Sequence, residues 1–395
     1  ASGSGIVTCK SAKISTMVSL PVFPPAVLLA TGALVTSMVP SRSARRVIAC
    51  VVPLVTLAYI GLALPLETRT TVSFLTLELS VLRVDRLSQV FGSIFSLIAF
   101  IGGVYAWHNP DRKQQVASLL YTAGAVGATF AGDYVALYLF WELMAVSSVF
   151  LIWARNEPMS QRAGNRYLLV HLTGGAILLA GIIMHTAATG SLAFEAIAPG
   201  GVGWGPWLIL LGFCLNAAIP PLGAWLPDAY PKATITGAVF CSALTTKTAV
   251  YALLRAFPGW EILVLAGVAM ALYGLIYAVL SNDIRELLSY HIISQVGYMV
   301  TGVGLGTPLA INGATAHAVC HILYKALLFM GAGVVIHTTK RSKLTELGGF
   351  LSRQRLTFSL YLIGALSISG FPLWNGFVSK SMVVSSTWDA QLDWA

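Results

Sequence analysis

Residues 317–333, HAVCHILYKALLFMGAG, carry two histidines and a lysine in a stretch that is otherwise apolar enough to lie in lipid. His317, His321 and Lys325 are four residues apart, which places them on one face of a helix. A charge at the centre of a bilayer costs at least about 2.5–3.5 kcal/mol, so such residues usually mark an ion pathway. The stretch therefore predicts a membrane helix whose titratable face relays protons.

Three further charges lie in or beside apolar stretches. Glu142 lies in LYLFWELMAVSSVF, Lys247 lies in VFCSALTTKTAVYALL, and Lys380 ends ISGFPLWNGFVSK. A buried carboxyl or ammonium group that gains and loses a proton is a carrier, because burial and neighbouring charges set its proton affinity. Together with the first stretch, these positions predict a membrane protein that moves protons or other cations.

The composition supports this prediction. Hydrophobic residues make up 56% of the 395 residues and charged residues 10%, whereas soluble domains carry about 25% charged residues. The five cysteines form no CxxC pair, and the sequence has no nucleotide-binding loop, so we expect no cofactor and no metal. The net charge of +9 is assigned to loops that set the topology and not to nucleic-acid binding.

Apolar runs separated by short polar breaks predict an all-α polytopic membrane protein with about twelve transmembrane helices. The helices are expected at residues 20–39, 47–66, 87–107, 116–131, 133–153, 167–188, 206–229, 234–255, 262–280, 284–305, 310–337 and 356–385. Residues 1–16 are polar and are interpreted as a disordered or non-native N-terminal extension. Residues 17–395 are predicted to form a single membrane domain.

The distribution of basic residues predicts the orientation. Fifteen of the 24 lysines and arginines fall in loops on one side of the predicted membrane, and six fall on the other side. The remaining three are Lys247, Lys325 and Lys380. Because cytoplasmic loops are enriched in basic residues, we expect the N-terminus to lie outside the cytoplasm and the protein to reside in a bacterial inner membrane.

Two predicted helices are interrupted. The seventh contains Pro220-Pro221 and the twelfth contains Gly370-Phe371-Pro372, and proline breaks a helix by removing a backbone donor. The breaks are five helices apart, so they fall in segments of opposite direction. Residues 116–255 and 262–385 are therefore predicted to be inverted repeats, the second of which is incomplete at its C-terminal end.

The candidate pathway residues leave alternatives open. Glu142 is either a proton-binding site or a structural carboxylate, and Lys247 is a proton carrier, a counter-ion to Glu142, or both. His317 and His321 have the spacing of metal ligands, but the sequence supplies no third ligand near them. His291 either links neighbouring sites or is a satisfied core histidine.

Three other polar positions receive an interpretation. Lys380 follows a helix break and is interpreted as a gate. Asp228, in WLPDAYP, is assigned to the cytoplasmic end of the seventh helix, where it caps or holds the adjoining loop, and it is counted with Asn216 among the candidate pathway residues. Asp133 is interpreted as a structural residue at the start of the fifth helix, where a carboxylate complements the helix dipole.

Several segments resemble a known family. They are DYVALYLFWELMAVSS, LGAWLPDAYPKATITGAVFCSALTTKTAVYALLR, NDIRELLSYHIISQVGYM, HAVCHILYKALLFMGAG and LTELGGF, within residues 85–385. They resemble the antiporter-like subunits of Mrp-type cation/proton antiporters, respiratory complex I and membrane-bound hydrogenases, and most closely the Mrp-type D subunit. The resemblance implies a fourteen-helix fold, other membrane subunits as partners, and proton-pathway roles for residues that match the family's motifs: Glu142, Lys247, His317, His321, Lys325 and Lys380.

The sequence departs from the family pattern in two respects. Asn216 stands where the family usually has a lysine that pairs with the helix-5 glutamate, and Gly223 stands where a histidine is common. Because asparagine does not titrate, Lys247 is the expected substitute partner of Glu142. The second departure is length, since the family's helices 13 and 14 are missing: either the chain is a fragment or a neighbouring subunit completes the fold.

These observations favour a membrane subunit of a Mrp-type antiporter that exchanges Na⁺ or another monovalent cation for H⁺. One alternative is a proton-pumping subunit of an NADH-quinone oxidoreductase or a membrane-bound hydrogenase. A second alternative is a scaffold subunit that transports nothing, which Asn216 and the short C-terminal half favour.

Overall fold

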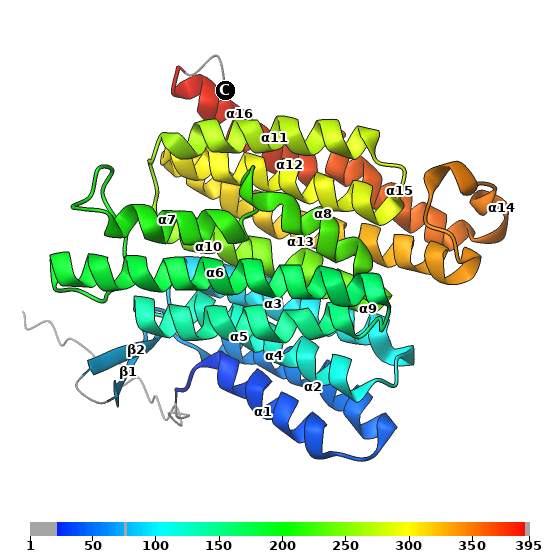
Figure 1. Cartoon of the computed structure of the whole chain (residues 1–395), viewed down its shortest axis with the longest axis horizontal. Coiled ribbons are helices and arrows are strands. Elements are labelled where there is room, and N and C mark those ends of the chain that lie inside the picture. Colours follow the sequence, from blue (N-terminus) through cyan, green and yellow to red (C-terminus); the bar gives the residue numbers. More distant parts are fainter. Residues whose placement is uncertain (1–21, 75–76, 392–395) are drawn as a thin grey trace, which may run out of the picture.

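Each of the twelve predicted segments coincides with one helix or with two helices separated by a break (Figure 1). The computed structural model describes residues 22–74 and 77–391, so the predicted extension at residues 1–16 lies outside the described residues. The unbroken helices are α1 (Pro25–Met38), α2 (Arg42–Ala58), α3 (Arg86–Tyr105), α4 (Arg112–Phe130), α5 (Tyr134–Trp153), α6 (Pro158–Thr189), α11 (Ile262–Leu280), α12 (Ile284–Leu305) and α13 (Pro308–Thr339). The broken segments are α7 (Gly205–Asn216) with α8 (Trp225–Ala229), α9 (Ile235–Ala243) with α10 (Thr245–Ala256), and α15 (Arg355–Ser369) with α16 (Asn375–Asp389).

Both predicted breaks are confirmed, and a third occurs where the sequence predicted a continuous helix. The segment predicted at residues 234–255 is divided at Leu244, between α9 and α10. No proline or glycine marks this position, so no local signal in the sequence indicated the break. The two predicted breaks lie in segments that run in opposite directions (Figure 1), and the inverted-repeat relationship itself stays a prediction.

In the described part of the chain, seven helical segments are long and apolar enough to cross a membrane. They are Arg42–Ala63, Arg86–His108, Tyr134–Trp153, Pro158–Thr189, Ile235–Ala256, Ile262–Leu280 and Pro308–Thr339. Other segments are short, broken or more polar. The helix α4 illustrates the last case, because neighbouring helices bury it from Ala117 to Phe130, with partial exposure only at Leu120. A helix that faces protein rather than lipid tolerates polar side chains.

A two-stranded hairpin was not predicted. Strands β1 (Arg69–Phe74) and β2 (Leu77–Arg83) pair in antiparallel fashion between α2 and α3. The backbone N–H of Gly132 donates to the carbonyl of Ser80, and Arg83 donates to the carbonyl of Phe194 at 2.9 Å. These contacts anchor the hairpin to the loops beside α5 and α6.

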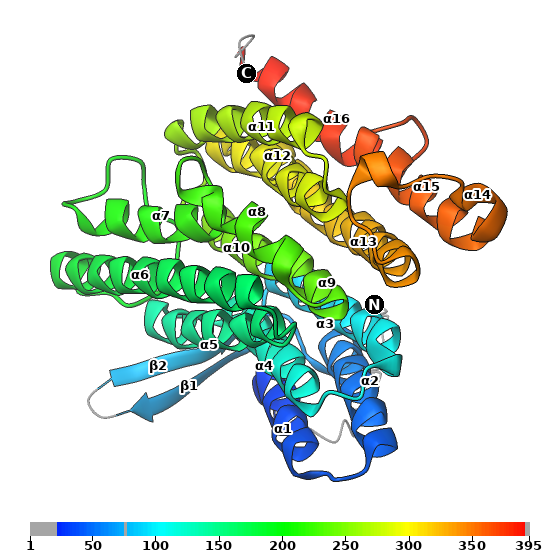
Figure 2. The same ribbon diagram turned by 45° about the vertical axis from the view of Figure 1, so that its right-hand side comes forward.

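The helices form two groups around a shared middle (Figures 1 and 2). Helices α4 to α7 lie on one side, α11 to α13 with α15 and α16 lie on the other, and α3, α9 and α10 lie between them. Glycines bring α11 and α12 close together: a β-carbon at Gly267 or Gly297 would overlap the backbone of the facing helix. Small residues permit such close approach of membrane helices.

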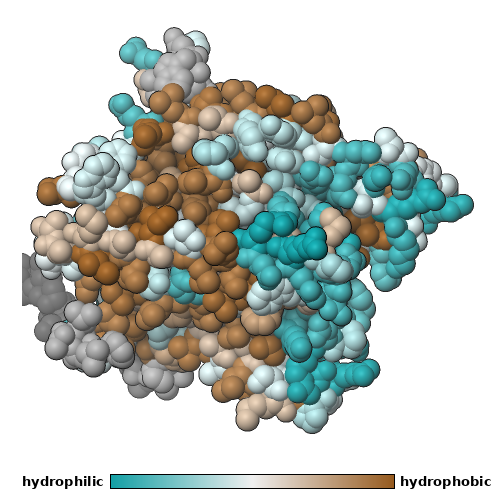
Figure 3. All heavy atoms as spheres, in the orientation of Figure 1, coloured by the Kyte–Doolittle hydropathy of each residue, from teal (hydrophilic) through white to brown (hydrophobic). Residues whose placement is uncertain are grey.

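The two ends of the bundle differ in charge. An apolar belt covers α5 to α7 and α11, while hydrophilic residues gather at the end near α9 and the short helix α14 (Phe350–Arg353) (Figure 3). This basic end contains Arg112, Arg155, Arg285 and Lys343, and the strand-like bridge between Asp283 and Lys343 lies there. The opposite end contains the hairpin and Glu195. The described residues named here therefore lie at the ends of the bundle that the sequence predicted for them.

Candidate functional site

Lys247 lies at the break between α9 and α10 and is fully buried, with 0% of its surface exposed. Its ammonium donates hydrogen bonds to the carbonyl of Ser242 at 2.5 Å and to the hydroxyl of Thr246 at 3.0 Å. The last carbonyls before a helix break lack their usual helical partner. The break therefore supplies an uncharged acceptor for a buried ammonium group.

Lys380 is held in the same way at another break. Its ammonium, on α16, donates to the carbonyl of Ile368 at 2.5 Å, in the last turn of α15. The chain then turns at Gly370, whose φ of +74° suits glycine. The ammonium also lies 5.4 Å from the ring centroid of Tyr298, within cation–π range.

The helix α13 presents His317, His321 and Lys325, all with 0% exposure. His317 Nδ1 is 2.9 Å from the hydroxyl of Ser379 on α16, and the two histidine rings lie 6.2 Å apart. Within residues 22–74 and 77–391, neither nitrogen of His321 nor the Lys325 ammonium has a hydrogen-bond partner. Buried polar groups without partners are rare, and they point to water or a transferred ion.

These groups form one electrostatic neighbourhood. Lys247 lies within electrostatic range of His317, His321 and Lys325. His291, half-buried on α12, lies within range of Lys325 and Lys380. Helix α10 packs against both α12 and α13, so the break at Lys247 adjoins the row on α13.

Glu142 lies apart from this neighbourhood. Its carboxylate lies against Gly175 of α6, where a β-carbon would overlap Oε1. In the part of the chain that the structure describes, Oε1 has no hydrogen-bond partner and the carboxylate forms no ion pair. The expected pairing of Glu142 with Lys247 is therefore wrong: the ammonium binds Ser242 and Thr246 instead.

Asn216 ends α7 and is fully buried. Neither atom of its amide has a hydrogen-bond partner among the described residues. The neighbouring carbonyl of Leu215 accepts from the indole of Trp225 at 3.0 Å, which ties the break to α8. Gly223 lies against the backbone of Ala218, and a β-carbon there would overlap it, so the histidine common in the family does not fit this backbone.

A cluster of buried hydroxyls was missed by the sequence analysis. The hydroxyl of Tyr167 is 2.8 Å from that of Ser148 and 3.4 Å from that of Thr245, and Thr245 is 2.5 Å from the hydroxyl of Tyr121. We call Tyr121, Ser148, Tyr167 and Thr245 the hydroxyl cluster; it joins α4, α5, α6 and α10. Thr245 lies two residues before Lys247 in the sequence. The sequence signal was weak, because single hydroxyls in apolar helices commonly bond their own backbone.

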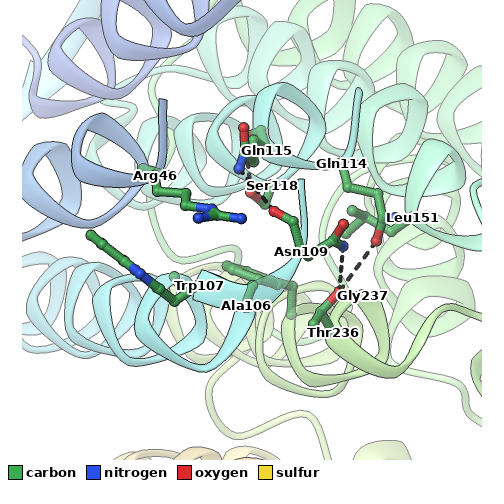
Figure 4. A pocket seen from close by; sticks show the side chains of 13 residues that line it. Arg46, Ala106, Trp107, Asn109, Gln114, Gln115, Ser118, Leu151, Thr236 and Gly237 are labelled. Atoms are coloured by element: carbon green, nitrogen blue, oxygen red, sulfur yellow. Dashed lines mark hydrogen bonds between the residues drawn. The ribbon is translucent and has the colours of Figure 1, made fainter. Parts of the chain in front are cut away.

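Two groups at the basic end lie apart from the buried row. Asp228 forms a two-pronged ion pair with Arg166, at 2.8 and 2.7 Å, and fixes α8 to α6. A cleft between α2, α3, α4 and α9 receives the side chain of Arg46, opposite Asn109 and Gln115 (Figure 4). A guanidinium group repels cations, so this cleft is a poor site for Na⁺.

The opposite end holds a further ion pair. Arg255, at the end of α10, donates to both carboxylate oxygens of Asp85 at 2.8 and 2.9 Å. Burial raises the pKa of the Asp85 carboxyl, but the hydrogen bonds and charge of Arg255, with the N–H of Ser88 and the charge of Arg83, hold that pKa below its ordinary value. Asp133 has the predicted structural role, since it caps α5 by accepting from the N–H of Ala136 at 2.7 Å.

Metal-ligating side chains do not gather in the described residues, where no group of three histidines, cysteines or carboxylates could hold an ion. The buried row itself offers imidazole and ammonium groups that can bind protons, and the hydroxyl cluster lies beside it.

Residues 131–395 match the family described as "NADH:quinone oxidoreductase/Mrp antiporter, TM". The chain is 32% identical to the D subunit of the Na(+)/H(+) antiporter of Alkalihalophilus pseudofirmus over 75% of its own length and 66% of that protein. It is 30% identical to the A/B subunit of a probable K(+)/H(+) antiporter of Rhizobium meliloti over 79% of its length, and to the L subunit of the NADH-quinone oxidoreductase of Mycobacterium tuberculosis over 77%. A chain of the Mrp complex from Dietzia superposes with a TM-score of 0.81 at 23% identity, covering 93% of this chain and 75% of that one.

These relatives are longer than the chain. The matched region spans 33% of the Rhizobium protein, 66% of the Alkalihalophilus protein and 51% of the Mycobacterium protein. The similarity establishes a polytopic membrane fold of the antiporter-like type, and it covers the broken helices and the buried row.

Proposed function

Because the chain belongs to the NADH:quinone oxidoreductase/Mrp antiporter transmembrane family, we propose that it is a membrane subunit of a Mrp-type Na⁺/H⁺ antiporter. Protons move along its buried titratable side chains, and other membrane subunits complete the complex. The observation that carries this proposal is the fully buried row of Lys247, His317, His321 and Lys325. Lone buried charges are expensive and persist where they serve transport.

The geometry suggests an order of transfer. Glu142 takes up a proton on one side of the row, and the hydroxyl cluster leads from α5 and α6 to Thr245, beside Lys247. From Lys247 the proton passes to the His317, His321 and Lys325 face, and then to Lys380 at the second break. His291, within electrostatic range of Lys325 and Lys380, is a further carrier. Asn216 and Asp228 lie outside this route: Asn216 ends α7 at the break, and Asp228 is engaged by Arg166.

The orientation is part of the same proposal. Fifteen of the 24 basic residues fall on one side of the membrane by the sequence-based assignment, and this side faces the cytoplasm of a bacterial inner membrane. The N-terminus then lies on the outside.

Transport in everted membrane vesicles tests the function. Vesicles that contain the chain and its partner subunits are acidified inside, and the release of protons on addition of Na⁺ is followed with a pH-sensitive dye. Lys325→Ala should abolish the release while the complex remains assembled. Lys343→Ala, on an exposed loop, is the matched control and should behave as wild type. Full transport by Lys325→Ala would refute the proposed pathway.

The relative in Mycobacterium, which belongs to an NADH-quinone oxidoreductase, supports a second candidate, a proton-pumping subunit of a redox complex. In that case NADH oxidation, and not Na⁺, would drive proton movement in the same vesicles. If neither Na⁺ nor NADH moves protons and only deletion of the whole chain has an effect, through loss of the other subunits, the chain is a scaffold.

A further inference from the structure

We propose that His171 carries protons between Glu142 and the hydroxyl cluster, in place of a direct contact between Glu142 and a lysine. The inference rests on the proposed function and adds a residue to its pathway. It starts from the position of Glu142, which is separated from Lys247 and has no ion-pair partner among residues 22–74 and 77–391.

The tautomer of His171 leaves one nitrogen free. The side chain is 1% exposed, and its Nδ1 is 2.9 Å from the carbonyl oxygen of Tyr167. A carbonyl oxygen only accepts, so Nδ1 carries the proton and Nε2 carries the lone pair in the neutral ring. Among the described residues, Nε2 is buried without a hydrogen-bond partner. This arrangement leaves a proton acceptor ready inside the bundle.

His171 lies on the face of α6 that joins the two groups. Gly175, His171 and Tyr167 are four residues apart, so they line one side of the helix. Gly175 lies under the Glu142 carboxylate, and Tyr167 meets Ser148. Glu142 and Ser148 both belong to α5 and are six residues apart, so a rise of 1.5 Å per residue separates them by about 9 Å along the helix axis. His171 occupies the level between them.

The surroundings hold the ring in place and contain few competing groups. The imidazole stacks on Tyr167 with ring centroids 4.0 Å apart and meets the edge of Trp225 at 4.4 Å. The elements packed against α6 carry these titratable groups: Tyr134, Tyr138 and Glu142 on α5, Cys214 on α7, Asp228 on α8, and Tyr230 and Lys232 in the turn after α8. Arg166 engages Asp228 at the basic end. Since Arg166 engages Asp228, Glu142 of α5 is the carboxylate that can exchange a proton with His171.

The transfer moves one proton through intervening water. The Glu142 carboxyl group loses the proton and Nε2 gains it, which converts two neutral groups into a carboxylate and an imidazolium. The imidazolium then releases the proton from Nε2 to water at the hydroxyl cluster, where each hydroxyl accepts one proton and donates another toward Thr245. The ring returns to its neutral form, and no other bond changes.

Na⁺-driven proton release in everted vesicles tests the inference with His171→Gln and His171→Asn, whose amides do not titrate. Both should slow release by about 100-fold, the low end of the range for loss of a positioned proton-transfer group. The loss should persist from pH 6 to pH 9. His185→Gln, a change of another histidine on α6, is the control and should retain wild-type transport. In the Glu142→Gln background, His171→Gln should cause no further loss, because both residues serve the same step.

Nitrogen-15 NMR of the wild-type protein decides the question if the variants do not assemble. It should show one buried histidine protonated at Nδ1 and bare at Nε2 that becomes doubly protonated as the pH falls. A histidine that keeps one form throughout would overturn the inference, as would wild-type transport by His171→Gln. If the wild type itself does not transport, the proposed function fails together with the inference. If the wild type and His171→Gln both transport, the inference alone fails.

Discussion

The ammonium of Lys247 donates a hydrogen bond to the carbonyl oxygen of Ser242 at 2.5 Å, across the break between α9 and α10. Lys380 contacts Ile368 in the same manner at the break between α15 and α16. A backbone carbonyl has no charge, so each lysine gains or loses a proton without stranding an ionic partner. In the proposed pathway, helix breaks at membrane depth supply uncharged acceptors for the ammonium groups that carry protons.

Replacing Lys247 by methionine should abolish Na⁺-driven proton release without lowering the thermal unfolding midpoint. Methionine fills a similar volume and removes a charge that is costly to bury without an ionic partner. Lys113→Met, at an exposed position on α4, is the control for loss of a lysine. Wild-type transport by Lys247→Met would exclude this lysine from the route.

Ser379→Ala should slow transport several-fold, because the hydroxyl orients the ring of His317 through Nδ1. His317→Gln should slow it further. If the serine acts through the histidine, the double variant should transport as slowly as His317→Gln alone. Independent, additive losses in vesicle assays would show that Ser379 has another role.

Gly175→Ala should reduce transport several-fold, because the new methyl group displaces the Glu142 carboxylate. The free energy of unfolding should change by less than about 1 kcal/mol, since alanine favours the helix by up to about 1 kcal/mol and the flexible glutamate yields. The adjacent Gly174→Ala contacts Leu215 instead and is the matched control. Equal transport rates for Gly175→Ala and Gly174→Ala would show that Glu142 is not part of the pathway.

Asp85→Asn should destabilise the protein by about 2–3 kcal/mol at pH 7, somewhat below the ~3–5 kcal/mol expected for a fully buried pair, because Asp85 is partly exposed. The folded-state pKa of Asp85 lies below its unfolded value, so the stabilisation is present above the unfolded pKa and is lost as the pH falls through the folded pKa. Thermal unfolding in detergent should therefore show a difference between variant and wild type at pH 7 that disappears in strong acid. A difference that is independent of pH would assign the effect to packing.

The orientation can be tested by cysteine labelling in a background without native cysteines. Glu195→Cys lies on an exposed loop at the hairpin end and should react with an impermeant thiol reagent in intact cells. Lys343→Cys, at the basic end, should react only in everted vesicles. The reverse pattern would invert the proposed topology.

The positions of the membrane helices follow from the sequence, because hydropathy is a local property. Each predicted segment is a helix or a broken helix, and the breaks at Pro220-Pro221 and Gly370-Phe371-Pro372 follow from the chemistry of proline and glycine. The sequence did not reveal the break at Leu244 or the hairpin at residues 69–83. Their backbone is fixed by contacts with distant segments, such as the bond from Gly132 to Ser80.

The buried charges were also evident in the sequence, since Glu142, Lys247 and Lys325 stand out in apolar surroundings. Tertiary structure alone decided their partners. It separated Glu142 from Lys247, and it placed Tyr167 and Thr245, which are 78 residues apart, in the same hydroxyl cluster. Hydrogen bonds between helices depend on which faces meet in the bundle. Composition and spacing along one helix specify its face but not the residue opposite.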